Sequence, residues 1–547
     1  MSASTEHDLD VLIVGGGPAG TMLALELAAQ GVSFRVVDKA PQRSDKSRAI
    51  IIQPRSFEMM NRHGIAHKLY KKGNPSGGPL CWLNNKPIVD VNIKTVANYK
   101  DSEFALPCLL SQAETEGYLD ECLRERYGRE IEHGIEAESI LQDREGVNVI
   151  LRNVNEGTKE EIRAKYVIGA DGAHSIVRKS SGNIKFDGGT YAQEFIMCDG
   201  MIEGFTLSPD RYHLVLGNGL LIVFPMARGW FRVMASRGAF SSAAEPTLEE
   251  MQTVLGNKLP GGGKITNTTW VTNFRLHHRI VDSYRDARLF VIGDAAHLHS
   301  PVGGQGLNTS LQDAVNLGWK LARAARGDGD RDGDGDGLLD SFDAERRPIG
   351  QELLAKTDRT FTMLSLTNRL AVCLRNVLVP WVAPYITSPG ALSHIYGFMS
   401  QFAINYRESA IVHTGTAFTG PVLAGDRAPD GDIYDDGVDG EGVAKRLYGI
   451  LAPDSYYLVL FASSSSADSG SELEELERVA ARFGDINTDK ARVHIIVQER
   501  DGRHIYSEKL YDHYGFTSPG YAYIRPDYYV ASIGNLEHVD EFLGWLK

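Results

Sequence analysis

The chain carries near its start the stretch VLIVGGGPAG, residues 11–20, in which an apolar run is followed directly by Gly-x-Gly-x-x-Gly. In this pattern the first glycine allows a tight turn, the second lets backbone N–H groups approach a pyrophosphate, and the third permits close packing of a helix on a strand. The phosphate then lies at the helix N-terminus, where unpaired N–H groups and the dipole favour an anion. The stretch therefore predicts a strand, turn and helix that bind a dinucleotide.

The residues that follow complete this unit. Apolar side chains between Met22 and Ala28 predict a helix that ends near Gly31, and residues 34–38 predict the next strand. Asp38 ends that strand, where a carboxylate can accept both hydroxyls of an adenosine ribose. Glycines, helix, strand and acid in this order are far more specific than the glycines alone.

A second glycine-rich stretch, VIGDAAHLHSPVGGQGLN, occupies residues 291–308. A buried strand would deliver the Asp294 carboxylate at its carboxyl end, and the Pro/Gly loop would let backbone approach a planar ligand. Taken alone, the loop could be an ordinary glycine-rich turn. From Leu307 to Leu321 apolar residues recur at steps of three and four, which predicts one long amphipathic helix. A third strand over residues 166–169 leads into Asp171 and Gly172.

These three motifs, at residues 15–20, 171–178 and 293–308, resemble the signatures of the class A flavoprotein monooxygenases, the family of para-hydroxybenzoate and phenol hydroxylases. The resemblance covers about residues 8–350, and a C-terminal portion with Arg525-Pro526-Asp527 resembles the thioredoxin-like appendage of phenol hydroxylases. It implies FAD as cofactor and NADPH or NADH as co-substrate. It also implies that a flavin C4a-hydroperoxide inserts one oxygen atom from O2 into a phenolic or polyketide-like aromatic.

We therefore predict an α/β fold with a Rossmann-like FAD-binding domain, an inserted antiparallel-sheet substrate domain and a C-terminal thioredoxin-like α/β domain. The expected divisions are residues 1–185 for the first part of the FAD-binding domain with a substrate-domain segment near 75–110, 186–285 for the substrate sheet, 286–415 for the second FAD-binding part and a helical region, and 420–547 for the thioredoxin-like domain. Antiparallel strands are expected between residues 190 and 236.

The C-terminal domain shows its own pattern. We expect strands at residues 457–461, 493–497 and 521–524, a helix opened by a capping box at Ser471 and Glu474, and a closing helix from Asn535. No cysteine follows Cys373, which excludes dithiol chemistry in this domain. We assign it a structural or dimer-forming role.

The motifs and the resemblance together assign a set of residues to the cofactor. Asp294 and Gln112, on a helix expected at residues 111–127, would hold the ribityl chain, and Arg48 would lie near the pyrophosphate. The helix N-terminus near Leu307 would point at the flavin pyrimidine, where reduction places negative charge. Arg43, Arg48 and His174 are candidates for a transient NAD(P)H surface. The cofactor set comprises Gly15, Gly17, Ala19, Gly20, Asp38, Lys39, Arg48, Gln112, Asp171, Gly172, Asp294, Pro301, Gly304, Gly306, Leu307 and Asn308.

Substrate contacts follow the family pattern less closely. Arg232 matches a family arginine that faces flavin and substrate, but Met234 replaces the tyrosine usually found two positions on, and Ile50 replaces the acidic base of phenol hydroxylases. Because strand neighbours face opposite sides, one of Tyr212 and His213 can face the chamber. We take Arg232, Pro301, Tyr212 and His213 as catalytic candidates, and interpret His297 and His299 as structural histidines.

Four functions compete on this scaffold. The first is NAD(P)H-dependent hydroxylation of an aromatic compound, and the second is Baeyer–Villiger oxidation or epoxidation, which the missing acidic base leaves open. The third, a flavin oxidase or dehydrogenase, is disfavoured by the paired Asp-Gly and Gly-Asp motifs. The fourth, a binding protein that keeps FAD only as structure, is disfavoured by the unbroken pocket loop.

Composition limits the partners. The 547 residues suggest two to four domains, and a net charge of −14 opposes a nucleic-acid partner. Five scattered cysteines favour neither a metal site nor disulfides, and the Asp/Gly-rich residues 326–337, which imitate a calcium loop, are interpreted as a solvated loop. The first ten residues lack the pattern of a signal peptide, and the apolar window at residues 377–386 is too short to span a membrane. We expect a cytoplasmic protein, and a homodimer is left open.

Overall fold

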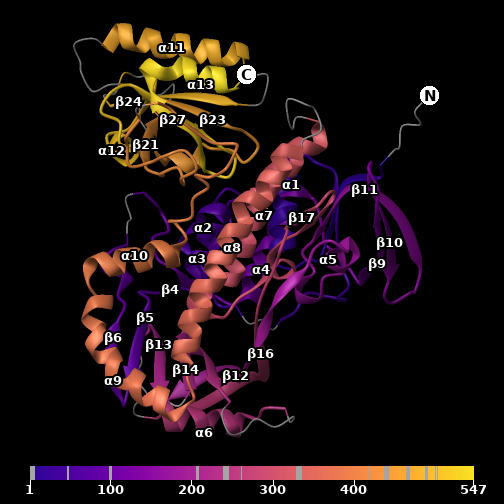
Figure 1. Cartoon of the computed structure of the whole chain (residues 1–547), viewed down its shortest axis with the longest axis vertical. Coiled ribbons are helices and arrows are strands. Elements are labelled where there is room, and N and C mark those ends of the chain that lie inside the picture. The colour runs from indigo at the N-terminus through magenta and orange to yellow at the C-terminus, as the bar shows by residue number, and fades with distance from the viewer. Residues whose placement is uncertain are drawn as a thin grey trace.

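The computed structural model describes residues 7–45, 49–97, 101–204, 208–217, 219–237, 245–259, 262–327, 336–416, 418–435, 443–462, 469–486, 491–498, 501 and 503–546. Three eight-stranded sheets organise these residues, and a small three-stranded sheet lies between the first two along the chain. Figure 1 shows the C-terminal sheet at one end of the molecule, with the long helix α8 running from it toward the second sheet. The α/β fold expected from the sequence is confirmed.

The first sheet has a parallel centre that presents its strand ends along one edge. Its main path runs β17 (Arg285–Asp286), β18 (Leu289–Val291), β11 (Lys159–Gly169), β1 (Leu9–Val14), β2 (Phe34–Asp38) and β8 (Glu132–His133), and β10 (Val147–Asn153) and β9 (Ile135–Gln142) extend from β11. The helices of this part are α1 (Pro18–Gln30), α4 (Gln112–Tyr127), α5 (Ile176–Ser181) and α7 (Gln305–Arg326). Because β1, β2, β11 and β18 run parallel, the loops after Val14, Asp38, Gly169 and Val291 meet at the same edge. The strands and helices predicted here are confirmed.

The second sheet is largely antiparallel and confirms the expectation for residues 190–236. Its order is β19 (His297–Leu298), β16 (Lys264–Val281), β12 (Phe186–Glu203), β15 (Trp230–Ser236), β14 (Gly219–Pro225), β13 (Tyr212–Gly217), β5 (Pro79–Leu83) and β6 (Lys86–Asp90). Helix α6 (Leu248–Lys258) contacts β12 and β16. The small sheet of β3 (Ile51–Ile52), β7 (Cys108–Leu109) and β4 (Asn74–Pro75), together with α2 (Pro54–Asn61) and α3 (Ala66–Lys72), follows the first Rossmann unit.

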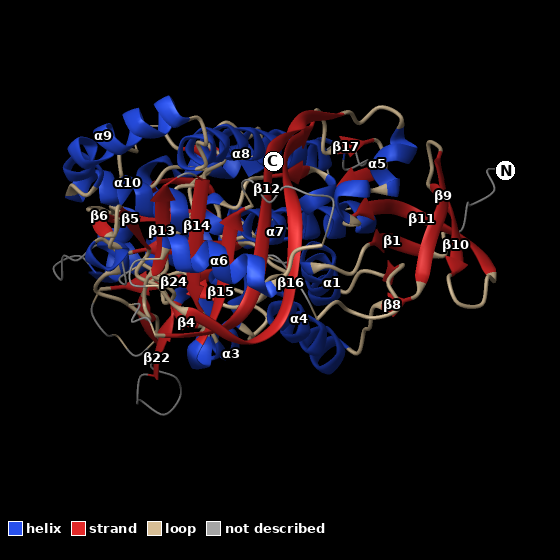
Figure 2. Ribbon diagram, turned by 90° about the horizontal axis from the view of Figure 1, so that it is seen from below, coloured by secondary structure: helices blue, strands red, loops and turns tan. Residues whose placement is uncertain are grey.

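Three helices follow the glycine-rich loop and α7. They are α8 (Asp336–Leu364), α9 (Arg369–Ile386) and α10 (Pro389–Ser400). Helix α8 begins inside the Asp/Gly-rich stretch, of which residues 328–335 lie outside the described residues. In the described part of the chain, no helix by itself has the length and apolarity needed to cross a membrane, and α9 and α10 meet that requirement only as a pair bent by 93°. Figure 2 shows both helices at the outer edge of the molecule, near β5 and β6.

The C-terminal unit contains an eight-stranded sheet with helices. Its order is β20 (His413–Thr414), β27 (Val530–Asn535), β26 (Gly520–Ile524), β23 (Tyr457–Phe461), β24 (Arg492–Val497), β25 (Ile505–Tyr506), β21 (Asp432–Asp435) and β22 (Val443–Arg446), with helices α11 (Ser469–Ile486), α12 (Leu510–Tyr514) and α13 (Val539–Leu546). Five of these strands, β20, β21, β22, β25 and β27, were not predicted from the sequence. Asn535 therefore ends a strand, and the closing helix starts at Val539, because residues 530–535 pair with β26. Helix α11 begins at Ser469, two residues before the predicted cap. The thioredoxin-like assignment stays a prediction.

The amphipathic prediction for α7 is wrong on its polar side. Residues from Leu307 to Ala322 are buried all round the helix, and they include Asp313, Asn316 and Lys320. Helix α8 and the C-terminal unit cover the face that the sequence assigned to solvent. The charges on that face are therefore paired inside the protein.

The pairing forms a buried network between the C-terminal unit and the rest of the chain. Arg525 donates to both carboxylate oxygens of Glu345 on α8, at 2.7 and 2.9 Å, and to Asp527 at 2.6 Å. Lys320 on α7 contacts the same Glu345 at 2.7 Å, and Trp319 donates its indole N–H to Asp527 at 3.1 Å. The Arg525, Glu345 and Lys320 side chains have no solvent exposure. The resembling Arg-Pro-Asp stretch thus anchors the C-terminal unit to α7 and α8.

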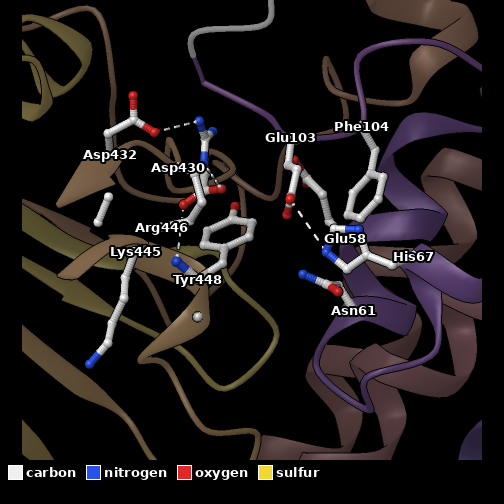
Figure 3. Close-up of a pocket in the computed structure, with 12 residues that line it drawn as sticks. Glu58, Asn61, His67, Glu103, Phe104, Asp430, Asp432, Lys445, Arg446 and Tyr448 are labelled. Atoms are coloured by element: carbon white, nitrogen blue, oxygen red, sulfur yellow. Dashed lines mark hydrogen bonds and ion pairs between the residues drawn. The ribbon is translucent and has the colours of Figure 1, made fainter.

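The contact region between the C-terminal unit and the rest of the chain is called the seam below. A pocket of about 390 Å³ opens beside it, between α2, α3 and the C-terminal unit (Figure 3). Five of its side chains form ion pairs within the pocket: Arg446 contacts Asp430 at 2.8 Å and Asp432 at 3.2 Å, and His67 contacts Glu103 at 3.3 Å. The pocket is therefore interpreted as part of the seam.

Candidate functional site

A cavity of about 370 Å³ lies where the carboxyl edge of the first sheet faces the second sheet. One wall comes from the loop after β1, from α4 and from the Pro/Gly loop before α7. The opposite wall comes from β12, β14, β15 and β16. The lining includes Gly17, Ala19, Ile50, Gln112, Gly172, Met197, Phe224, Arg232, Met234, Phe274, Arg275, His277, Asp294, His299, Pro301, Gly304, Gln305, Gly306 and Leu307.

The three glycines of the first motif have different surroundings. Gly15 has φ +110°, and an added Cβ would lie 2.4 Å from the carbonyl oxygen of Ala170. A Cβ on Gly20 would lie 1.9 Å from the carbonyl oxygen of Gly15, so that α1 can approach β1 only with glycine here. Gly17 has no atom within 4 Å of such a Cβ and lines the cavity. The first and third glycines therefore serve packing, and the second leaves room for a ligand at the start of α1.

Acidic side chains follow the strands of the first sheet. Asp38 accepts hydrogen bonds from the backbone N–H groups of Gly16 and Ala40, each at 2.8 Å, which fixes the carboxylate beside the glycine turn. Asp171 accepts from the N–H of Ile176 at 2.6 Å, and burial raises its pKa although hydrogen bonds lower it in part. Asp294 is exposed and lines the cavity. A carboxylate at this place can accept hydrogen bonds from ligand hydroxyl groups.

The Pro301–Leu307 loop is held in a left-handed conformation that needs glycine. Gly304 has φ +62°, and a Cβ there would lie 2.6 Å from the Cβ of Ile51. Asn308 braces the loop: its amide accepts from the N–H of Gln53 at 2.7 Å and donates to the carbonyls of Ile51 and Gly304. Asn308 is fully buried, so that it supports the lining without being part of it.

The predicted cofactor residues fall into three groups. Those that line the cavity are Gly17, Ala19, Gln112, Gly172, Asp294, Pro301, Gly304, Gly306 and Leu307. Those that shape or brace the surrounding loops are Gly15, Gly20, Asp38, Asp171 and Asn308. Lys39 is exposed, and Arg48 lies outside the described residues. The first group, with a helix N-terminus and an exposed carboxylate, fits a dinucleotide with hydroxyl groups, which FAD is.

Arg232 reaches the cavity but is already bound to an acid. Its guanidinium donates to both carboxylate oxygens of Asp199 at 2.7 and 2.8 Å, and to the carbonyl of Ala49 at 3.1 Å. Only 2% of its surface is exposed. Trp270 also donates to Asp199, at 3.1 Å. The arginine is thus held rigidly in the wall between the two sheets.

The predictions for Tyr212 and His213 need correction. Both residues are buried, and neither is among the described residues that line the cavity. Tyr212 packs behind Phe224, with ring centroids 5.4 Å apart. His213 accepts a hydrogen bond from the indole N–H of Trp82 at 3.0 Å, and burial lowers its pKa to about 4. Because side chains alternate along a strand, the sequence predicted that one of the two would face the cavity. Neither does, because β13 does not line the cavity at these residues.

A chain of hydrogen bonds that starts in the cavity wall was not predicted. His299 Nε2 lies 2.9 Å from His297 Nδ1, and His297 Nε2 lies 2.8 Å from Asp313 Oδ2. Burial raises the pKa of Asp313, but Arg346 and His297 outweigh it and keep the carboxylate ionised. Asp313 can then only accept, so that His297 donates to it from Nε2.

His299 Nδ1, which lies at the cavity end of this chain of hydrogen bonds, has no hydrogen-bond partner among the described residues. Burial and the neighbouring His297 lower the pKa of His299 well below its ordinary value. His299 therefore stays neutral, with Nδ1 beside the cavity. The two histidines in His-x-His before Pro301 were the signal in the sequence, and the interpretation as purely structural residues overlooked the pairing with Asp313 on α7.

The remaining wall is apolar and aromatic. Met197, Phe224, Met234 and Phe274 come from four adjacent strands of the second sheet and line the cavity, together with Ile50. Such a surface favours a flat organic guest over a charged one. The cavity thus has a polar side suited to a dinucleotide and an opposite side that is largely apolar.

Comparisons with known proteins identify the family of this chain. The family described as FAD binding domain matches residues 8–357. The chain is 33% identical over 435 residues to pentachlorophenol 4-monooxygenase of Sphingobium chlorophenolicum, covering 78% of this chain and 76% of that protein. It is 31% identical over 538 residues to 6-methylpretetramide 4-monooxygenase of Streptomyces rimosus, covering 96% and 90%.

A solved structure extends the likeness to the whole chain. The crystal structure of CabE, an aromatic hydroxylase from angucycline biosynthesis, matches with a TM-score of 0.72 and 26% identity, covering 98% of this chain and 99% of that one. The family match covers more than half of the chain, and the relatives are monooxygenases. The chain therefore belongs to the class A flavoprotein monooxygenases, and it is an FAD-dependent enzyme of that type.

Proposed function

We propose that this enzyme consumes NADPH or NADH and inserts one oxygen atom from O2 into a phenolic or polyketide-like aromatic substrate. The observation that carries the proposal is the two-sided cavity, in which Gly17, Asp294 and Gly306 face an aromatic wall that contains Phe224 and Phe274. The names of the relatives, which refer to a chlorophenol and a pretetramide, support the same substrate class.

The residues that would hold FAD are those of the cavity lining on the side of the first sheet. Gly17 and the N-terminus of α1 would receive the pyrophosphate, Asp294 and Gln112 the ribityl hydroxyls, and the Pro301–Leu307 loop the flavin ring. Reduced FAD, when bound, supplies the electrons that activate O2 for transfer of one oxygen atom. The protein contributes position, and the apolar side chains Met197, Phe224, Met234 and Phe274 would exclude water from their side of the cavity.

Ile50 occupies the position at which phenol hydroxylases have an acidic base. His299, which lines the same cavity, is a polar side chain that can contact a substrate hydroxyl there. We propose that His299 accepts a hydrogen bond from a substrate hydroxyl at Nδ1. In this proposal a neutral His297 donates to Asp313 and accepts from Nε2 of His299, which leaves Nδ1 of His299 as the acceptor. A low pKa suits this role, because a neutral acceptor orients the hydroxyl without retaining its proton. Arg232 would contribute positive potential to the same wall while Asp199 holds it in place.

The nicotinamide co-substrate would bind at the surface during reduction. Among the candidates for that surface, His174 is exposed, and Arg43 donates to the carbonyl of Ala113 and pairs with Asp120 at 3.5 Å. The choice between NADH and NADPH is settled by comparing flavin reduction rates with each.

The test is an activity screen over phenols, naphthols and anthraquinones under ¹⁸O2, with cofactor consumption and product mass measured together. The proposal expects one ¹⁸O atom per product with the carbon ring intact. A ring-expanded lactone would support Baeyer–Villiger oxidation instead. Rapid release of hydrogen peroxide with every substrate, and no labelled product, would identify an oxidase and overturn the proposal.

The role of His299 is tested separately with a phenol that binds to the oxidised enzyme. Difference spectra should show a hydrogen-bonded phenol in the wild type, and His299→Phe should weaken binding while FAD content stays normal. An unchanged dissociation constant and an unchanged spectrum in His299→Phe would remove His299 from the substrate site and leave the proposed reaction standing.

A further inference from the structure

Helix α9 exposes a continuous apolar stripe. The exposed large hydrophobic side chains on this helix are Leu370 (82% exposed), Leu374 (61%), Val377 (57%), Leu378 (49%), Trp381 (77%), Val382 (46%) and Tyr385 (77%). Elsewhere in the described part of the chain such side chains occur singly, as with Leu141 and Leu248. Apolar patches of this extent mark a surface that another molecule covers.

The stripe follows the helical repeat, while the other side of α9 is fixed to the protein. Leu370, Leu374, Val377, Trp381 and Tyr385 succeed one another at steps of three and four, so that they lie on one face. On the other side, the buried Arg375 donates to the carbonyls of Leu364 and Gly217, at 3.0 and 2.8 Å. Rotation of the helix to hide the stripe would break these bonds, and the exposure is therefore built into the fold.

Charge decides between a lipid surface and a protein partner. Interfacial helices rely on several lysines or arginines that meet anionic headgroups. The exposed charged residue of α9 is Arg369, since Arg375 is buried, and the whole protein carries a net charge of −14. A single exposed arginine gives α9 little of the headgroup attraction on which interfacial helices rely. No acidic residue occurs between Asp358 and Glu408, so that two copies can approach each other here without carboxylate repulsion.

We propose that α9 is the interface of a homodimer, in which it packs antiparallel against α9 of a second copy. The stripe extends from Leu370 to Tyr385 and is symmetric about Val377 and Leu378, where a two-fold axis would pass. With large side chains counted at roughly 150–250 Å² each, the exposed fractions place on the order of 800 Å² of apolar surface in water. This area is about what one partner buries in a stable interface of standard size.

The antiparallel arrangement also gives Arg369 a partner. It would lie against the carboxyl end of the other α9, where the helix dipole is negative and the ring of Tyr385 is exposed. The C-terminal unit, for which a dimer-forming role was expected, uses its buried charges within its own chain through Arg525 and Glu345. The α9 stripe, by contrast, stays exposed in the single chain.

The first experiment measures the mass of the full FAD-loaded chain by sedimentation equilibrium over a dilution series. The wild type should have about twice the chain mass of 60.1 kDa, and Leu374→Glu and Trp381→Glu should halve it while FAD content stays normal. Leu141→Glu, on β9 and 69% exposed, is the matched control and should leave the mass unchanged. A wild type that is monomeric at every concentration overturns the proposal, and so does equal dissociation in the control.

The second experiment tests the symmetry by oxidative cross-linking in a Cys373→Ser background, because Cys373 is itself exposed on α9. Leu378→Cys lies at the proposed axis and should form a covalent dimer. Leu370→Cys is the control, since two copies would be roughly 20 Å apart at 1.5 Å per residue and beyond disulfide reach. Equal cross-linking of both variants would contradict the antiparallel arrangement. Sedimentation of a monomeric wild type with anionic vesicles, lost in Trp381→Glu, would assign the stripe to lipid and overturn the dimer.

Discussion

The FAD cavity and the buried network around Arg525 are two polar regions that both include residues of α7. The cavity is lined by the start of this helix, and the network involves Trp319 and Lys320 further along it. The two regions differ in how many of their polar groups have hydrogen-bond partners. In the network, Arg525 is bonded to both oxygens of Glu345 and to Asp527. In the cavity, His299 Nδ1 and Gln305 Oε1 have no hydrogen-bond partner among the described residues, and Gly17 and Gly306 have open space above them.

This difference separates a region that stabilises the fold from a region prepared for ligands. Charges that pair with one another away from solvent cost desolvation, and the fold keeps them only while every partner is present. Acceptors and glycines that face a cavity lack that mutual support and gain it from a ligand. Substitutions in the two regions should therefore separate stability from cofactor binding.

The largest effect is expected when the network loses its arginine. Arg525→Met leaves Asp527 buried without a counter-charge and leaves Glu345 with Lys320 alone, and it should lower the free energy of unfolding by about 3–5 kcal/mol. Denaturant unfolding followed by circular dichroism measures the change. Arg482→Met, which removes an exposed ion pair with Asp540, is the matched control and should cost less than about 1 kcal/mol. Equal effects in the two variants would show that the buried network does not stabilise the fold.

The next effect concerns the cavity alone. Asp294→Ala should weaken FAD binding by about 2–4 kcal/mol, because each hydrogen bond to a charged acceptor contributes roughly 1.5–3 kcal/mol. The free energy of unfolding of the apoprotein should not change. Titration calorimetry of apoprotein with FAD gives the affinity. Arg525→Met, measured where it is folded, should keep the wild-type affinity, and a loss there as large as in Asp294→Ala would erase the distinction between the regions.

Acid should distinguish a third kind of polar site, the buried histidine with its own partner. Burial lowers the pKa of His213 from its ordinary 6.5 to about 4. Between these pH values the imidazole is protonated in the unfolded chain and neutral in the folded chain. The stabilisation is complete above pH 6.5 and is lost as the pH falls from 6.5 to about 4. At about 1.4 kcal/mol per pKa unit the loss of stability totals about 3.5 kcal/mol. Unfolding measured across this range should fall less steeply in His213→Gln, and parallel curves would refute the assignment.

The smallest effect compares two glycines that have equal room for a Cβ. Gly17 lines the cavity and Gly256 lies on α6, and neither has an atom within 4 Å of an added Cβ. Gly17→Ala should reduce FAD affinity about tenfold, or about 1.4 kcal/mol, without destabilising the apoprotein. Gly256→Ala should leave affinity unchanged and stabilise the helix by about 0.5–1 kcal/mol. Unaltered FAD affinity in Gly17→Ala would place the pyrophosphate elsewhere.

The parts of the fold that the sequence predicted depend on local rules. The spacing of Gly15, Gly17 and Gly20 defines a strand, turn and helix by itself, and parallel strands bring Asp38 and Asp294 to the same edge. The helix after Leu307 and the strands near residues 212 to 236 follow from periodicity. These features need no knowledge of what packs against them.

The remaining features depend on contacts between distant parts of the chain. Periodicity placed Asp313 and Lys320 on a polar face of α7, but only the packed structure shows that Glu345 and Arg525 reach that face. Alternation gave Tyr212 and His213 opposite directions without indicating that Phe224 stands between Tyr212 and the cavity. The role of His299 depends on the pairing of a loop with α7, and it has no signal beyond the His-x-His spacing.

The most direct test of the account is the amount of FAD held by the purified chain. After incubation with FAD and removal of the unbound cofactor, the absorbance of the flavin and the protein concentration give the stoichiometry. The account predicts one FAD per chain in the wild type and a large loss in Asp294→Ala with the fold intact. A wild-type protein that remains colourless after this treatment would contradict it.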